Sequence, residues 1–191
     1  IDFTKTGFFQ PPGSPSGRLR LVTNFPDFTP APRPGVPGNV RPSNPFGLVL
    51  HSNTLYVIDA AQNNLQEVDI DDGSTVTLFS YPPRANPLPF GPPVIDAVPD
   101  SLRLFGDSLL VTFLTGFPFP PGLADARQYD LRTGADSRLI GGLTTAIDVL
   151  PVGNFTNSFY TLEFSANMLT GAPGRLRRFD SPTAQPVLIS D

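Results

Sequence analysis

Apolar and polar positions between residues 44 and 82 divide this part of the chain into short strands. Gly47–Leu50 is an apolar run, the pair Ser52-Asn53 makes a tight turn, and Leu55–Asp59 is a second apolar run. After a polar corner, Leu65–Asp69 alternates and Thr75–Ser80 returns. Continuous apolar runs are typical of strands buried on both faces, and alternation is typical of strands with one exposed face. The pattern predicts four consecutive antiparallel strands.

The same plan returns twice further along the chain. Leu55–Asp59 matches Leu109–Phe113 and Phe159–Glu163, with 54 residues between the first two starting points and 50 between the next two. The flanking strands are predicted at Ser101–Phe105, Ala126–Asp130 and Ser137–Ile140 in the second unit, and at Ala146–Leu150, Arg175–Asp180 and Pro186–Ser190 in the third. Three units therefore cover about 44–82, 98–141 and 143–190.

Repeats of this length with four short strands each indicate the blades of a β-propeller. Helical repeats would need apolar residues spaced 3.6 positions apart, and none of these segments has that spacing. We expect an all-β fold, a single propeller domain over 1–191 with three complete blades plus one outer strand, Arg18–Thr23. Since closed propellers need at least four blades, the chain is expected to form part of a six-bladed ring, or a ring that closes with a neighbouring chain.

The composition favours a folded chain with many turns. The 24 prolines and 17 glycines would suit disorder, but 39% hydrophobic residues and 16 phenylalanines supply a core. Seven prolines fall within 26–45, so 26–43 is predicted to be a proline-rich surface excursion. It is interpreted as a linker between strands, with recognition of a proline-binding partner as the alternative.

Charge and cysteine content exclude several classes of function. The formal charge is −4, and the basic residues are scattered apart from Arg175, Arg177 and Arg178, which argues against nucleic acid as a partner. No apolar run approaches the ~20 residues of a membrane span. Without cysteine there are no disulfides and no thiolate sites. The low charge density favours an exported protein, extracellular or periplasmic, and a chain that starts at Ile1 without a signal peptide is expected to be processed or partial.

Carboxylates carry the candidate metal chemistry. Asp59 and Glu163 hold the same position in two repeats, and a pair of this kind near a propeller channel suits a divalent cation such as Ca²⁺. Three further residues at the start of first strands are predicted to face the same channel mouth and contact a ligand: Asn44, Asp100 and Asp148. In the alternative interpretation Asp59 and Asn63 cap the corner through backbone N–H groups.

Two single features have simpler interpretations. His51 is the only histidine, so a Ser/His/Asp triad would have to use it, and a structural role is expected instead. Asn154-Phe155-Thr156 is a glycosylation sequon, which is interpreted as a chance match.

The segment Thr115–Gly122 interrupts the second repeat at the corner where the first has Ala60–Asn64. Its prolines lack N–H donors, so it cannot be a plain strand. It is predicted to plug the channel or cover the open edge of a blade. Alternatively, it offers an aromatic surface to a planar ligand or a partner chain. The residues expected to make that contact are Phe117, Pro118, Phe119 and Pro120.

Several motifs resemble known propeller families. Asn44-Pro45-Phe46-Gly47-Leu48, followed by Leu55–Asp59 and Asn63-Asn64-Leu65, resembles the NHL-type repeat. Leu114–Gly122, with Thr144–Asp148, Leu162-Glu163-Phe164 and Gly174-Arg175-Leu176, is similar to the ScyD/ScyE family over about 44–180. The chain departs from that family at Pro99-Asp100-Ser101 and at Ala146. The resemblance implies a propeller of exported bacterial proteins with no assigned chemistry.

Three functions remain open from the sequence. The first is an exported, non-catalytic propeller that acts as a binding or assembly module for a protein partner. The second is a metal-dependent hydrolase or lyase, similar to the lactonase propellers, that uses the channel carboxylates. The third is a structural subunit whose ring closes with a neighbouring chain.

Overall fold

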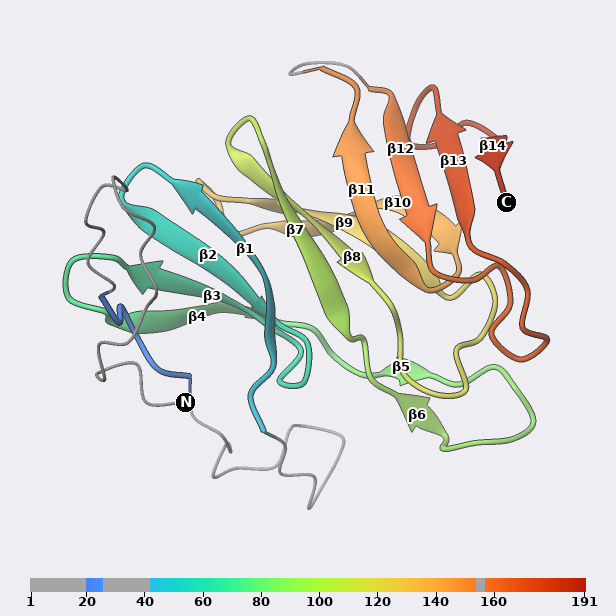
Figure 1. The fold of residues 1–191 in the computed structure, drawn as a ribbon, viewed down its shortest axis with the longest axis horizontal. Helices are drawn as coiled ribbons and strands as arrows, with labels where there is room; N and C mark the ends of the chain where they lie inside the picture. Colours follow the sequence, from blue (N-terminus) through green and yellow to red (C-terminus); the bar gives the residue numbers. More distant parts are fainter. Residues whose placement is uncertain (1–19, 26–41, 154–156) are drawn as a thin grey trace, which may run out of the picture.

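Three sheets of four antiparallel strands follow one another along the chain (Figure 1). The computed structural model describes residues 20–25, 42–153 and 157–191, and these residues form strands and turns without a helix. Sheet 1 comprises β1 (Pro45–His51), β2 (Thr54–Asp59), β3 (Asn64–Asp69) and β4 (Thr75–Ser80). Sheet 2 comprises β7 (Pro99–Phe105), β8 (Ser108–Phe113), β9 (Ala124–Asp130) and β10 (Asp136–Leu143). Sheet 3 comprises β11 (Ala146–Pro151), β12 (Phe159–Glu163), β13 (Arg175–Phe179) and β14 (Val187–Ser190).

Each sheet is a meander in which every strand pairs with its neighbours in sequence. The turn between the third and fourth strands is the same in sheets 1 and 2. Asp69 and Asp130 accept backbone N–H groups two residues ahead, and Gly73 and Gly134 close the turns at φ values of 75° and 72°. At Gly73 a Cβ atom would also collide with the backbone oxygen of Val22, so this turn requires glycine.

Two apolar layers join the three sheets. Leu109, Val111 and Phe113 of β8 pack toward sheet 1, and Leu110 of the same strand packs toward sheet 3. Alternate residues of a strand point to opposite faces, and sheet 2 is covered on both. All six residues of β8 are consequently buried. β8 contains the strand Leu109–Phe113, which was predicted from its match to Leu55–Asp59.

The first strands of the three sheets are neighbours: β1 lies against β7, and β7 lies against β11. At the start of each sheet a backbone bond of 2.9 Å ties the segment before the first strand to the residue after the second. These bonds run from Ala60 N to Asn44 O, from Leu114 N to Val98 O and from Phe164 N to Thr145 O. The repeat that the sequence predicts is therefore present in the backbone geometry.

The structure differs from the sequence predictions before and between the sheets. Residues 20–25 form no strand, so the outer strand predicted at Arg18–Thr23 is wrong in its described part. Arg20 instead donates to the carbonyl of Ile70 through its side chain. A small hairpin that was not predicted, β5 (Arg84–Ala85) with β6 (Val94–Ile95), lies between sheets 1 and 2. Most of the proline-rich excursion (26–41) and the sequon (154–156) lie outside the described residues.

The two end sheets each have one apolar face that no other sheet covers, and on that face of sheet 1 residues 22–25 border a hollow together with Leu48 and Val57. Leu48 and Leu50 on sheet 1, and Leu150 and Leu162 on sheet 3, are exposed. Within the described part of the chain no helix is long and apolar enough to cross a membrane.

Candidate functional site

The interruption of the second repeat lies against the β5–β6 hairpin. Residues 114–116 run beside 96–98, with backbone bonds from Leu114 N to Val98 O (2.9 Å) and from Gly116 N to Asp96 O (2.9 Å). The far end of the interruption is held by a bond from Gly122 N to Thr144 Oγ1 (2.9 Å). Both ends of the segment are thus fixed to the body of the protein.

The four residues expected to make ligand contacts in this segment fall into two groups. Pro118 and Pro120 are buried and anchor the loop, and Pro118 lies against Gly91 of the hairpin, where a Cβ atom would approach within 3.2 Å. Phe119 is half-buried, whereas Phe117 is 58% exposed. The two rings meet edge to face, 6.2 Å apart. They therefore do not form one flat platform, and a single ring is presented to solvent.

Phe117 borders a hollow of about 400 Å³ between the loop and the hairpin. Its walls are mainly apolar and include Pro92, Val94 and Val98, with Asp96 as the charged member. Val94 is itself exposed. We call this surface the Phe117 groove; it is formed by Pro92, Val94, Ile95, Asp96, Val98, Gly116 and Phe117.

Asp59 is buried at the corner of sheet 1 and is surrounded by donors. Its Oδ1 accepts the backbone N–H groups of Asn44 (3.0 Å), Ala61 (3.0 Å) and Gln62 (2.8 Å), and its Oδ2 accepts the hydroxyl of Ser43. These are the contacts of a corner cap. Asn44 takes part through its backbone, and no described contact engages its side chain as a ligand.

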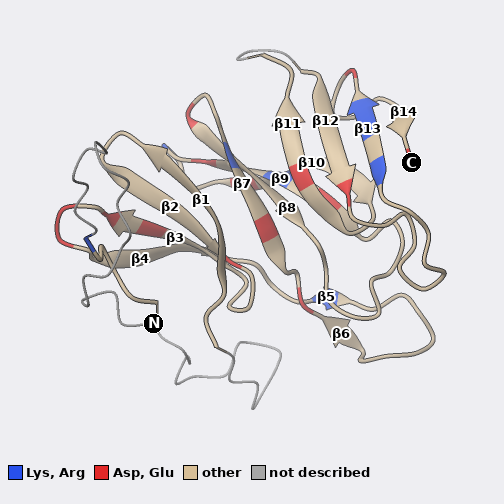
Figure 2. Cartoon of the chain, in the orientation of Figure 1, with Lys and Arg blue, Asp and Glu red and all other residues tan. Residues whose placement is uncertain are grey.

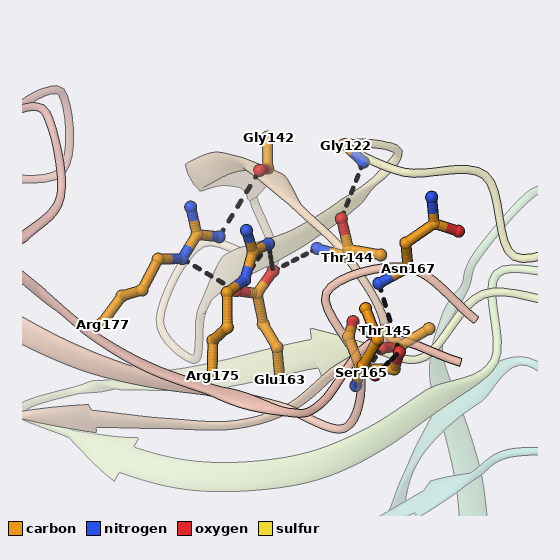
Figure 3. A network of polar contacts seen from close by, with 10 residues as sticks. Gly122, Gly142, Thr144, Thr145, Glu163, Ser165, Asn167, Arg175 and Arg177 are labelled. Carbon is orange, nitrogen blue, oxygen red and sulfur yellow. Dashed lines mark hydrogen bonds and ion pairs between the residues drawn. The ribbon is translucent and has the colours of Figure 1, made fainter. Parts of the chain in front are cut away.

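Glu163, the equivalent residue of sheet 3, meets arginines instead (Figure 3). Its carboxylate lies 2.8 Å from Arg177 Nε, accepts bonds from Arg175 at 3.1 and 3.2 Å, and accepts the backbone N–H of Thr144. With its side chain fully buried and two guanidinium groups beside it, the negative charge is compensated. The nearby Thr145 and Ser165 exchange hydrogen bonds that fix the start of β11 to the end of β12.

Asp100 and Asp148 lie on β7 and β11, the first strands of sheets 2 and 3. Acidic residues on both strands are red in Figure 2. Asp148 pairs with Arg103 across the two strands, with a distance of 3.0 Å to Nε. Asp100 is buried, and its carboxyl accepts the hydroxyl of Thr112 at 3.1 Å. Burial is the main cause that raises the pKa of Asp100 to about 8, and the charge of Asp148 adds to it.

The predicted carboxylates are not gathered into a ligand set. Among residues 20–25, 42–153 and 157–191, no group of three or more His, Asp or Glu side chains could hold a metal ion. Asp59 and Glu163 belong to the two end sheets and each is occupied by protein donors. The Ca²⁺ site stays a prediction. His51, at the end of β1, pairs in register with Thr54.

Sequence reasoning missed a second hollow, of about 330 Å³, between sheets 1 and 2. It is bordered by Tyr81, Arg84, Arg127 and Asp136. The first and last of these residues are 55 positions apart, and they do not form a short sequence motif. In the register of β9 against β10 Asp136 lies opposite Tyr129 and is a diagonal neighbour of Arg127, which donates to it. Tyr81 is added only by the packing of the two sheets.

No family model matches the chain, and no curated protein matches it in sequence. The structure is similar to a chain of the nidogen/laminin complex, with a TM-score of 0.52 and 10% identity over 79% of this chain and 52% of that one. It is also similar to two computationally designed proteins, Ika8 and Ika4, each with a TM-score of 0.43 and 14% identity. These matches cover 79% and 78% of this chain, and 36% and 72% of the designed chains.

The chain has a propeller-like, all-β fold. The first of these similarities, together with the three four-stranded antiparallel sheets, is the basis for that statement. The chain spans about half the length of the nidogen/laminin chain that it matches. At 10% identity the similarity concerns the fold alone.

Proposed function

We propose that the protein is an exported, non-catalytic propeller that binds a protein partner through the Phe117 groove. The observation that carries this proposal is the exposure of Phe117 on a loop in which Pro118 and Pro120 are buried. A large aromatic side chain that stays in water gives up the stabilisation that burial would provide. A ring held in place by its own loop can be buried by a partner at little cost in conformational entropy.

The walls of the groove suit an apolar segment of another protein. Aromatic residues in a hollow are typical anchors of protein interfaces, where a few side chains contribute most of the binding energy. Asp96 already accepts the side-chain amide of Asn63 at 3.1 Å, so apolar contacts are expected to provide most of the binding. The similarity to the nidogen/laminin chain, a protein known in a complex, supports a binding role in a general way. The resemblance to ScyD/ScyE proteins supports export from a bacterial cell.

A displayed library of random peptides tests this role without a known partner. Peptides enriched on the immobilised protein are expected to carry aromatic or proline residues and to lose about tenfold or more in affinity for Phe117→Ala. Phe46→Ala is the matched control, because Phe46 is 66% exposed on a different sheet and outside the groove. Enriched peptides that respond to Phe46→Ala and ignore Phe117→Ala would contradict the proposal.

A second candidate is a structural subunit whose ring closes with a neighbouring chain. The outer faces of sheets 1 and 3 support it. Leucines that are exposed on these faces have equivalents that are buried where two sheets pack together. Leu48 lies opposite Val57 in sheet 1, and Leu102 lies opposite the equivalent Val111 in sheet 2. Leu48 is 67% exposed, whereas Leu102 is 7% exposed. Leu162 is 42% exposed, and its equivalent Ile58, which faces sheet 2, is 0% exposed.

The two outer faces are complementary in kind. The outer face of sheet 3 is equivalent to the face of sheet 1 that packs on sheet 2. The outer face of sheet 1 is equivalent to the face of sheet 2 that packs on sheet 1. A second copy related by a two-fold axis would therefore bury sheet 3 of each chain against sheet 1 of the other. The two roles are compatible, since the Phe117 groove belongs to neither outer face.

The metal-dependent hydrolase or lyase has less support than either role. Calcium titration followed by thermal melting tests it: a midpoint that rises with millimolar calcium in the wild type and not in Asp59→Asn would favour the metal site.

A further inference from the structure

The hollow between sheets 1 and 2 contains a ladder of alternating charges. Arg84 Nη2 lies 2.6 Å from Asp125 Oδ1, and Arg127 Nη1 lies 3.4 Å from Asp125 Oδ2. Arg127 Nε then donates to Asp136 Oδ2 at 2.7 Å. Two arginines and two aspartates leave the site without net charge. The ladder joins β5 to β9 and β10, so the walls of the hollow are held by ion pairs.

Two polar atoms at this site have no partner among the described residues. The hydroxyl of Tyr81 and Oδ1 of Asp136 are both buried and unpaired. Tyr81 is 4% exposed, the side chain of Asp136 is 2% exposed, and both border the hollow. Buried polar groups in folded proteins are nearly always hydrogen-bonded, and leaving one unpaired is costly. Both residues line the hollow, so a molecule bound there is the candidate partner for these two atoms.

The chemistry of the two atoms defines what that molecule offers. Burial, and then the negative charge of Asp136, raise the pKa of Tyr81, so its hydroxyl is protonated and can donate or accept. Oδ1 of Asp136 can only accept from a donor while its partner oxygen is paired with Arg127. The ligand therefore needs a hydrogen-bond donor for Asp136. Beside that donor it needs a group that can either donate to or accept from the hydroxyl of Tyr81. Neighbouring hydroxyl groups have this property.

The remaining walls and the volume narrow the class further. Phe79, Pro82 and Pro83 give the hollow an apolar side. An anion would approach the carboxylate of Asp136, and a cation would approach two arginines, so the balanced charge favours a neutral ligand. The volume of about 330 Å³ is larger than one water needs and falls at the small end of the range for small-molecule sites. We propose that this hollow binds a neutral sugar through two adjacent hydroxyl groups.

Methyl glycosides of glucose, galactose and mannose are suitable probes, because they are neutral and carry adjacent hydroxyls in different orientations. Saturation-transfer NMR and titration of the wild-type protein are expected to show millimolar binding of at least one of them. Tyr81→Phe removes the unpaired hydroxyl without changing the packing of the ring, and it is expected to weaken that binding about tenfold. Its melting temperature reports separately on folding.

Tyr129→Phe is the matched control, because Tyr129 packs in the same apolar cluster and does not border the hollow. It is expected to leave glycoside binding unchanged. Sodium acetate and guanidinium serve as charged probes of similar reach. The proposal is overturned if no glycoside binds to the wild type, if Tyr81→Phe binds as tightly as the wild type, or if only a charged probe binds. A single ordered water that pairs Tyr81 with Asp136 would give the first of these results.

Discussion

The last residue of the second strand is buried in all three sheets, but its surroundings differ from sheet to sheet. In sheet 1 it is Asp59, whose charge is met by backbone N–H groups. In sheet 2 it is Phe113, with the guanidinium of Arg84 4.7 Å from its ring centroid. In sheet 3 it is Glu163, next to two arginines. A carboxylate is stable at this buried position in sheets 1 and 3 because each of these two sheets supplies its own compensating donors.

At Asp100 the hydroxyl of Thr112 compensates less than the cost of burial, so this residue should make stability depend on pH. Its pKa of about 8 in the folded protein exceeds the ordinary value of about 4 in the unfolded chain. Between these values the unfolded chain binds fewer protons at this residue, and the free energy of unfolding falls as pH rises from about 4 to about 8. Asp100→Asn cannot ionise. Relative to the wild type, it should gain on the order of a few kcal/mol at pH 8 and nothing near pH 4.

Urea unfolding of both proteins at three pH values across this window measures the difference. Asp107→Asn, at an exposed turn, is the control and should follow the wild-type curve at every pH. Parallel curves for wild type and Asp100→Asn would mean that Asp100 is ionised in the folded protein at neutral pH.

At the level of elements, every strand predicted within the three units overlaps an observed strand. Thr75–Ser80 and Phe159–Glu163 have the predicted bounds. Alternation and apolar runs locate these strands because the burial of each face follows directly from the sheet layers. The β5–β6 hairpin was missed because its two strands have two residues each and lie within a proline-rich stretch. Such short pairs leave no periodic signal.

Glu163 connects the elements of sheet 3, and Glu163→Gln should weaken that sheet. The change keeps the shape of the side chain but leaves Arg175 and Arg177 close together without a negative charge. Removing one partner from a buried ion pair typically costs about 3–5 kcal/mol of stability. Because the arginines are partly exposed, we expect the free energy of unfolding to fall by about 3 kcal/mol. Urea unfolding measures it.

Asp180→Asn provides the control for this loss, because Asp180 pairs with Arg178 at 2.7 Å on the surface of the same sheet. Its removal should change the free energy of unfolding by less than about 1 kcal/mol. Equal losses in the two variants would contradict the view that Glu163 is a buried structural centre.

At the level of the whole molecule, the candidate sites depend on contacts that a single sequence does not display. The sequence points to the Thr115–Gly122 loop because prolines and phenylalanines alternate there, but which ring is exposed follows from the packing of Pro118 on Gly91. The sugar site requires that Tyr81 from the end of sheet 1 meet Asp136 from sheet 2. Local sequence patterns are enough to predict the strands, whereas the candidate sites form only where strands distant in the sequence pack together.

Assembly is the property of the whole molecule that the outer faces of sheets 1 and 3 predict. If a second copy closes the ring, the native particle has twice the mass of one chain. Leu48→Glu or Leu162→Glu should each reduce it to one, because a carboxylate in either face would be buried without a partner in both of the two equivalent interfaces. Val76→Glu is matched in chemistry, since Val76 is 58% exposed on the edge strand β4, and it should leave the mass unchanged. Light scattering after size-exclusion chromatography gives the masses of the wild type and of the three variants. A wild-type chain that elutes with the mass of one copy, or a dimer that survives both leucine substitutions, would rule out closure by a second copy through these faces.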